Sequence, residues 1–256
     1  MKPKSFLQKA GYFLGSLGLL AAVYWRLVRP FQLRWGASRE EIQRPMPGDE
    51  LISNPAYLAT RAITIEGKPE AIWPWLIQMG YTRAGFYGYD LIENLGSPRG
   101  IRSAQSILPE FQHPQTGDPL PISPAGGLNF SAIEPNQFMV WSGGPGWGGY
   151  TWALYPIDEG HTRLVSRARF NHTWSKPAQL ALDLITEFSE HLAIPKILQG
   201  VKGRVEGDIE PAAKANAEVA LYLVSAFTYL GSLVFILLRP LTWRRGLANL
   251  GAGAAW

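Results

Sequence analysis

The sequence contains no cysteine, and this absence excludes disulfide frameworks, thiolate metal sites and cysteine nucleophiles. Charged residues make up only 17% of the chain, below the usual quarter, whereas aromatic residues reach 12% with ten tryptophans. The four histidines show no spacing typical of a metal site; they are His113, His161, His172 and His191. We therefore expect a folded chain without a metal or cofactor, suited to a membrane or an apolar ligand.

Basic residues gather at the two ends of the chain. Residues 1–29 carry five bases and no acid, and residues 216–256 carry three arginines against Glu218. The middle, 30–215, holds 16 bases and 19 acids and is slightly acidic. A nucleic-acid-binding domain shows a basic stripe on its folded part, so this pattern argues against a nucleic-acid partner. Basic residues beside apolar segments are typical of membrane proteins.

Two apolar segments lie near these ends. The uncharged run 219–238 has about the length that crosses a bilayer, so we predict a transmembrane helix over 216–240 and a basic tail after it, 241–256. The apolar run 11–25 predicts a membrane anchor within 1–29, with a cleaved signal peptide as the alternative. The two segments predict a location in a membrane, most simply the bacterial cell membrane, with the bilayer as a partner.

An irregular lead-in, 30–57, separates the first segment from the periodic part of the chain. Its four prolines argue against a long helix. Ser38 with Glu41 is expected to cap one short helical turn over 39–44.

The central part, 58–210, carries the patterns of one folded domain. Apolar residues at helical spacing predict a short helix at 70–79 and a long helix from 176 to about 205. Alternating segments predict strands at 59–66, 118–122, 128–134, 137–142, 150–157 and 162–172. This order indicates an α+β fold in which a curved antiparallel sheet wraps around the long C-terminal helix and encloses a cavity.

Two stretches of this domain are distinctive: ATRAITIEGKPEAIWPWLIQMG at 59–80 and RAGFYGYDLIEN at 83–94. The first is similar to the opening strand and helix of the START/Bet v 1-like superfamily, also called the SRPBCC or polyketide cyclase/lipid-transport group. The second resembles a block of an uncharacterised bacterial subfamily whose members are often membrane-tethered. The resemblance covers about 34–207 and implies the helix-grip fold, here flanked by the predicted transmembrane helices.

The resemblance also implies a function. Members of the superfamily bind sterols, lipids, polyketides or plant hormones in the sheet–helix cavity, and some cyclise or dehydrate polyketides. We therefore expect membrane-anchored binding of a hydrophobic or amphipathic small molecule, such as a lipid, an isoprenoid or a polyketide-like compound. A polyketide cyclase- or dehydratase-like enzyme is one alternative, and a membrane interaction protein without a ligand is another. No catalytic residue is transferred, because the superfamily shares no single catalytic set.

One short segment concentrates polar side chains that suit a ligand site, namely Arg83, Tyr87, Tyr89, Asp90, Glu93 and Asn94. Two carboxylates beside an arginine suit acid–base catalysis, with Asp90, Glu93 and Arg83 as the candidates. The same groups suit recognition of a polar head group at the mouth of the cavity. They also suit local pairing that fixes a turn, and the sequence leaves these three interpretations open.

Tryptophans on the strands are candidates for the wall of the cavity, because ligand pockets are mostly apolar and aromatic. We expect Trp141 and Trp152 to contact the ligand, with ordinary core packing as the alternative. The glycine-rich stretch 143–149 lacks the Gly-Lys-Ser/Thr ending of a phosphate loop. It predicts a flexible loop between two strands, with Trp147 at its tip as a gate or as a contact with the membrane interface.

Overall fold

The computed structural model describes residues 11, 15, 18–19, 21–94, 102–124, 126–144, 146–171 and 177–238. These residues belong to two compact units. One unit is Pro30–Ala212, and the other combines Met1–Arg29 with Ala213–Trp256.

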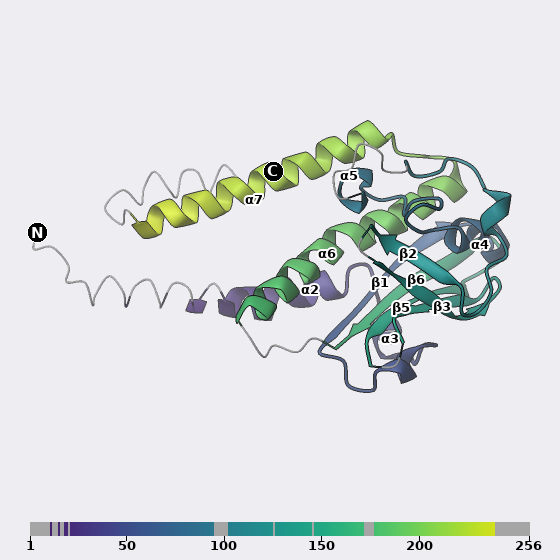
Figure 1. The fold of residues 1–256 in the computed structure, drawn as a ribbon, viewed down its shortest axis with the longest axis horizontal. Helices are drawn as coiled ribbons and strands as arrows, with labels where there is room; N and C mark the ends of the chain where they lie inside the picture. Colours follow the sequence, from purple (N-terminus) through teal and green to yellow (C-terminus); the bar gives the residue numbers. More distant parts are fainter. Residues whose placement is uncertain are drawn as a thin grey trace, which may run out of the picture. The chain divides into compact units, whose positions relative to one another are not determined.

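Six antiparallel strands of the Pro30–Ala212 unit form one sheet in the order β1-β6-β5-β4-β3-β2 (Figure 1). β1 pairs with β6 along its whole length, from Tyr57 opposite Phe170 to Glu66 opposite His161. The strands are β1 Tyr57–Glu66, β2 Pro119–Ser123, β3 Gly126–Glu134, β4 Phe138–Ser142, β5 Gly148–Pro156 and β6 His161–Phe170. All six predicted strands are present, and the alternation of apolar and polar residues placed their ends within one or two residues.

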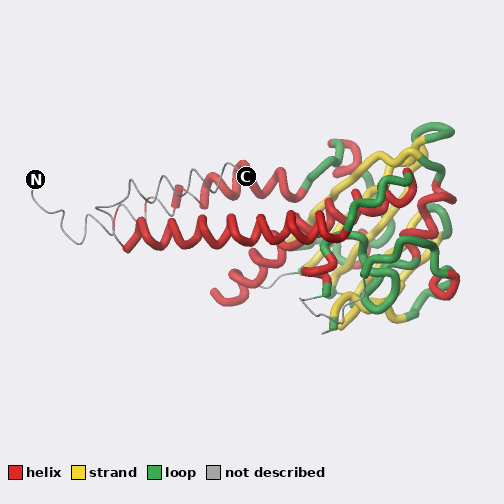
Figure 2. Tube along the Cα trace, turned by 90° about the horizontal axis from the view of Figure 1, so that it is seen from above, coloured by secondary structure: helices red, strands yellow, loops and turns green. Residues whose placement is uncertain are grey.

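One long helix, α6, packs against β1 and α4 on the inner face of this sheet (Figure 1; Figure 2, helices in red and strands in yellow). α4 begins with Pro69, whose fixed φ angle suits a first helical turn, and it also accommodates Pro74. The helices and helical turns are α2 Arg29–Leu33, α3 Arg39–Gln43, η2 Asp49–Leu51, α4 Pro69–Ile77, α5 Asp90–Glu93, η3 Pro109–Phe111 and α6 Pro177–Glu206. The predicted α+β arrangement of a sheet around a long helix is confirmed.

The core between the sheet and α6 is apolar toward the C-terminal half of the helix. Ile197, Leu198 and Val201 of α6 pack in one cluster with Ile65 of β1 and Leu164 of β6. Earlier in the helix, among the described side chains of residues 183–191, the buried ones are acidic: Asp183, Glu187 and Glu190. Of these three acids, Glu190 lines the cavity between the sheet and α6.

The lead-in covers part of the outer face of the sheet. Ser38 and Glu41 form the predicted capping box at the start of α3, with backbone-to-side-chain hydrogen bonds of 2.7 and 3.1 Å. From β6, Arg163 donates to the carboxylate of Glu41 at 2.6 Å, and Arg167 donates to that of Asp49 at 2.8 Å. These ion pairs hold the lead-in against the sheet, and the segment belongs to the same compact unit.

The second unit contains η1, Tyr24–Val28, and nearly all of α7, Ala212–Leu238. α7 includes the uncharged run for which a transmembrane helix is predicted. Within the part of the chain that the structure describes, no helix combines the length and the apolar character needed to cross a membrane. The predicted tail, 241–256, and most of the predicted anchor before residue 21 lie outside the described residues.

Candidate functional site

A cavity of about 320 Å³ lies between the inner face of the sheet and α6. Its volume falls at the lower end of the range for ligand pockets in proteins. Ile185 on its α6 side is 62% exposed, so the cavity reaches the surface there. The wall is mainly aromatic and aliphatic, and it includes Phe86, Trp141, Tyr150, Trp152, Ile194 and Ile197.

Two tryptophans form the centre of the aromatic wall. Trp141 of β4 and Trp152 of β5 have ring centroids 5.3 Å apart, and Trp141 also meets the rings of Phe86 and Tyr150 at 6.4 Å. Both indoles are buried, with 2% and 1% of their surface exposed. The Nε1 atom of each has no hydrogen-bond partner among the described residues. Buried indole N–H groups normally have a partner, so these two donors are unusual.

A buried polar network meets the cavity at Glu190 of α6. Its carboxylate accepts hydrogen bonds from the hydroxyls of Tyr57 and Tyr150, each at 2.6 Å. The Arg61 guanidinium lies 3.7 Å from the same carboxylate and donates to the Tyr57 hydroxyl at 3.1 Å. Burial, followed by the charge of Glu190, raises the pKa of both tyrosines above the ordinary value, so both stay protonated donors.

Glu93 of α5 also lines the cavity. Burial, and next the nearby charge of Asp90, raises the pKa of Glu93 to about 8. The backbone amides of Tyr89, Phe86 and Gly88 partly offset this shift, yet no described donor reaches Oε1 with hydrogen-bond geometry. The carboxyl is therefore mostly protonated at neutral pH, and its Oε1 atom is buried against the backbone of Gly88.

Arg83 and Tyr87, two of the predicted site residues, fix the chain after α4. Arg83 donates to the carbonyl oxygens of Ile77 and Phe111 at 3.0 and 3.3 Å, and its guanidinium lies 4.6 Å from the centre of the Phe111 ring. The Tyr87 hydroxyl donates to the carbonyl oxygen of Trp75 at 3.0 Å. Neither Arg83 nor Tyr87 is among the described residues that line the cavity.

Asp90, Asn94 and Tyr89 also make local contacts. The Asp90 carboxylate accepts a hydrogen bond from the Ser103 hydroxyl at 2.6 Å and from the Ser103 amide at 3.2 Å. The Asn94 amide donates to the backbone carbonyl of Asp90 at 2.8 Å. The ammonium of Lys196 lies 5.2 Å from the centre of the Tyr89 ring. Local pairing accounts for these contacts without a ligand.

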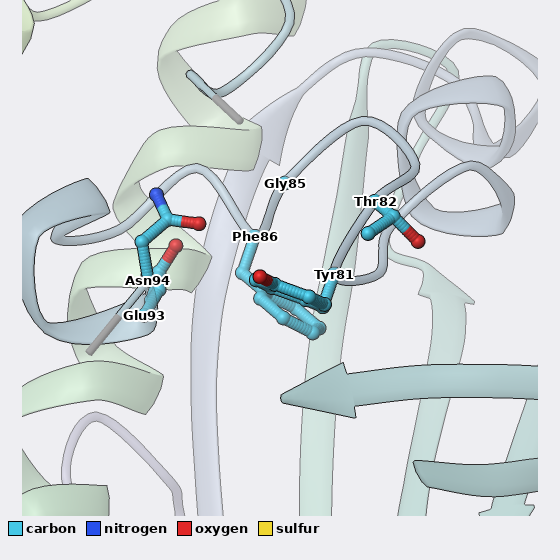
Figure 3. A pocket seen from close by; sticks show the side chains of 6 residues that line it. All are labelled: Tyr81, Thr82, Gly85, Phe86, Glu93 and Asn94. Atoms are coloured by element: carbon cyan, nitrogen blue, oxygen red, sulfur yellow. The ribbon is translucent and has the colours of Figure 1, made fainter. Parts of the chain in front are cut away.

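The structure brings three predicted site residues together at the cavity: Glu93, Trp141 and Trp152. Glu93 also meets Asn94 at a second pocket of about 10 Å³, which holds roughly one water molecule. Figure 3 shows these two side chains on one side of the small pocket and Thr82 on the other. Of these two pockets, the larger has the size of a ligand site. Within the described ranges, no cluster of acids and histidines is suited to holding a metal ion.

The sequence pattern did not point to Glu190, Tyr57 or Tyr150, which lie at the polar end of the site. One signal was available in β1, where Tyr57 and Arg61 share the inward-facing register with Ile65. A charged side chain in that register needs a buried partner.

No family model matches the sequence, and no curated protein matches it. Among solved structures, the chain is similar to a polyketide cyclase-like protein from Corynebacterium glutamicum, with 16% identity, coverage of 60% of this chain and 93% of that one, and a TM-score of 0.38. It is similar to CalC, a self-sacrificing resistance protein from Micromonospora echinospora, with 11% identity, 59% and 95% coverage and a TM-score of 0.37. A START superfamily protein from Mycobacterium smegmatis shows 15% identity, 59% and 99% coverage and a TM-score of 0.32.

The strand order decides the fold. β1 pairs with the last strand, β6, and the sheet so formed packs on the long helix α6. The chain has the helix-grip fold. The expected helix-grip architecture is thereby confirmed for the domain. The membrane-tethered subfamily of helix-grip proteins stays a prediction, because it rests on the sequence block at 83–94.

Proposed function

We propose that this helix-grip domain binds a hydrophobic or amphipathic small molecule, such as a lipid, an isoprenoid or a polyketide-like compound. The observation that carries the proposal is the cavity of about 320 Å³ with its largely apolar wall. Burying apolar ligand surface there is favourable by about 25 cal/mol per Å². The exposed edge at Ile185 supports entry of a ligand from the surface.

The test is native mass spectrometry of the purified full-length chain, followed by organic extraction of bound molecules. We expect one enriched apolar species. Ala193 lines the cavity, so Ala193→Phe is expected to fill it and to abolish this binding. Gln199→Phe adds the same ring at an exposed position of α6 and serves as the control. Equal ligand content in both variants would contradict the proposal.

We also propose that the terminal segments attach the domain to a bilayer. The support is the uncharged run 219–238 and the exposure of large apolar side chains along it, such as Leu221, Val224 and Phe227 at 42%, 62% and 71%. Cells expressing the full chain, or a version without residues 216–256, are separated into membrane and soluble fractions. The full chain is expected in membranes. Its complete recovery in the soluble fraction would rule the attachment out.

Catalysis of a cyclisation or dehydration is the second candidate function. Glu93 favours it, because a carboxyl with a pKa of about 8 at a cavity wall suits a general acid at neutral pH. Asp90 is engaged by Ser103 and is the weaker candidate. If the domain is an enzyme, Glu93→Gln abolishes turnover of an identified ligand while binding persists. If the domain only binds, the wild-type chain leaves that ligand chemically unchanged.

A further inference from the structure

We infer that the cavity holds a single hydrocarbon chain of about 10–14 carbons, which enters tail-first from the end at Ile185. Fused-ring molecules and lipids with two acyl chains are too wide for it. This inference rests on the proposed binding function and specifies the class of ligand. It follows from the length of α6 along which the cavity runs, from the volume of the cavity and from the burial of its two ends.

The length of the cavity follows from its wall on α6. Four lining residues of this helix follow one another every four positions and so share one face: Ile185, Ser189, Ala193 and Ile197. Between the first and the last of them an α-helix rises about 18 Å. An extended hydrocarbon chain advances about 1.25 Å per carbon, because its C–C bonds of about 1.5 Å alternate in direction. About 14 carbons therefore span this wall.

The width of the cavity follows from its volume. A volume of about 320 Å³ spread over about 18 Å of helix gives an average cross-section of about 18 Å². Carbon atoms in contact lie about 4 Å apart, so one chain fills about 16 Å² and two chains side by side fill about 32 Å². A methylene takes about the space of a water molecule, roughly 30 Å³, so the volume holds about 11 of them. Length and volume thus agree on one chain.

The two ends of the cavity differ in burial. At one end Ile185 is 62% exposed, and the neighbouring hydroxyl side chains of Thr186 and Ser189 are exposed as well. At the other end Ile197 is 5% exposed, and Leu198 beside it belongs to the core and is not among the described lining residues. A polar head group keeps its contact with water at the open end, whereas the tail gains by burial at the closed end. This difference sets the tail-first direction.

The wall opposite α6 suits such a chain. Its described lining residues are mainly aliphatic and aromatic, and they include Phe86, Ile92, Ile122, Trp141, Tyr150 and Trp152. A hydrocarbon chain gains from this wall by leaving water and by dispersion contacts, and it needs no hydrogen bond. The carboxylate of Glu190 is already paired, because it lies 3.7 Å from the Arg61 guanidinium. The chemistry of the wall therefore fits the same ligand as its shape.

The test compares two alcohols that have equal numbers of carbons and one hydroxyl each but differ in width: 1-dodecanol and cyclododecanol, whose ring is about two chains wide. Equilibrium dialysis of the full-length chain, held in an amphipathic polymer instead of a single-chain detergent, measures binding, and polymer without protein is the blank. Each affinity is divided by the octanol–water partition coefficient of the alcohol, so that the ratio reports shape. We expect 1-dodecanol to bind at least about tenfold more tightly on this scale. A ratio near one or below overturns the inference but supports a binding cavity, whereas no binding by either alcohol overturns both proposals.

A series of 1-alkanols from hexanol to hexadecanol then measures the length of the cavity. The uncorrected affinity is expected to rise about fourfold with each buried methylene and to level off between about 10 and 14 carbons. Ile197→Ala shortens a side chain at the closed end, so the affinity should level off about two carbons later. Leu198→Ala removes as many carbons from a buried neighbour outside the described lining and is the matched control. A limit that stays in place in Ile197→Ala, or that moves equally in both variants, overturns the inference.

Discussion

Glu190 of α6 accepts a hydrogen bond from the Tyr57 hydroxyl of β1 at 2.6 Å, across 133 positions of the sequence. The same carboxylate accepts from Tyr150 of β5 and lies near the buried Arg61. One acid thus joins the long helix to two strands beside the cavity. Because Arg61 is only 1% exposed, Glu190 is also its countercharge in the interior.

Glu190→Gln is expected to destabilise the fold by about 3 kcal/mol, because it leaves the buried Arg61 without a countercharge. Urea unfolding of the variant and the wild type measures the difference in the free energy of unfolding. Glu159→Gln changes an exposed acid and should leave the midpoint unaltered. A variant at position 190 that is as stable as the wild type would show that the network is not an important source of stability.

Arg167→Lys is expected to loosen the lead-in from the sheet. Arg167 is 3% exposed and donates to Asp49 at 2.8 Å and to the backbone carbonyls of Glu41 and Arg44 at 2.6 and 2.8 Å. A lysine ammonium cannot reproduce the planar fork of a guanidinium, so we expect a loss of about 2 kcal/mol. Hydrogen exchange should rise in the lead-in around Glu41. The exposed Arg39→Lys is the control, and equal protection in both variants would refute the expectation.

Glu93 predicts a pH dependence of stability. Its pKa is about 8 in the folded chain against an ordinary value of 4.5, so the folded state binds the proton more tightly. The contribution of this proton to the free energy of unfolding is fully present below about pH 4.5. It decreases as pH rises to about 8, by at most about 1.4 kcal/mol per pH unit. Glu93→Gln removes the titration, so its stability relative to wild type should rise across this window. Urea midpoints at several pH values test this, and a constant difference from pH 5 to 8 contradicts it.

Gly148→Ala should cost more than Gly144→Ala. Both glycines have positive φ angles, +101° and +103°, so an alanine strains either site by about 1–3 kcal/mol. A Cβ at Gly148 also collides with the backbone oxygen of Arg169, whereas one at Gly144 meets no atom within 4 Å. We therefore expect Gly148→Ala to lose about 2 kcal/mol more than Gly144→Ala in thermal unfolding. Equal losses would mean that the strands separate easily at this point.

Periodicity was sufficient to predict the strands and the long helix, because each buries one face against the core. It also singled out Trp141 and Trp152, which alternate inward on neighbouring strands. Periodicity did not show that Glu93 lines the cavity whereas Asp90, three positions away, does not. The Asp90 carboxylate instead accepts a hydrogen bond from Ser103, which comes from a later loop.

Periodicity failed in the N-terminal half of α6. Helical spacing groups Phe188 with the apolar residues of the helix, and it treats Glu187 and His191, four positions apart, as a surface pair. In the structure Phe188 is 44% exposed, Glu187 is 3% exposed and His191 is half-buried. A helical pattern assigns polar residues to solvent and contains no information on partners from other elements. Tyr57 and Tyr150, whose hydroxyls donate hydrogen bonds to Glu190, are such partners.

The full-length pairing of β1 with β6 has a consequence for synthesis on the ribosome. The hydrogen bond from Arg163 to Thr64 joins residues 99 positions apart, so β1 leaves the ribosome long before its partner strand exists. At about 5–20 residues per second, the wait is roughly 5 to 20 seconds. During that time the backbone groups of β1 that will pair with β6 have no native strand partner. Closure of the sheet, and with it formation of the cavity, is therefore a late event in the life of the nascent chain.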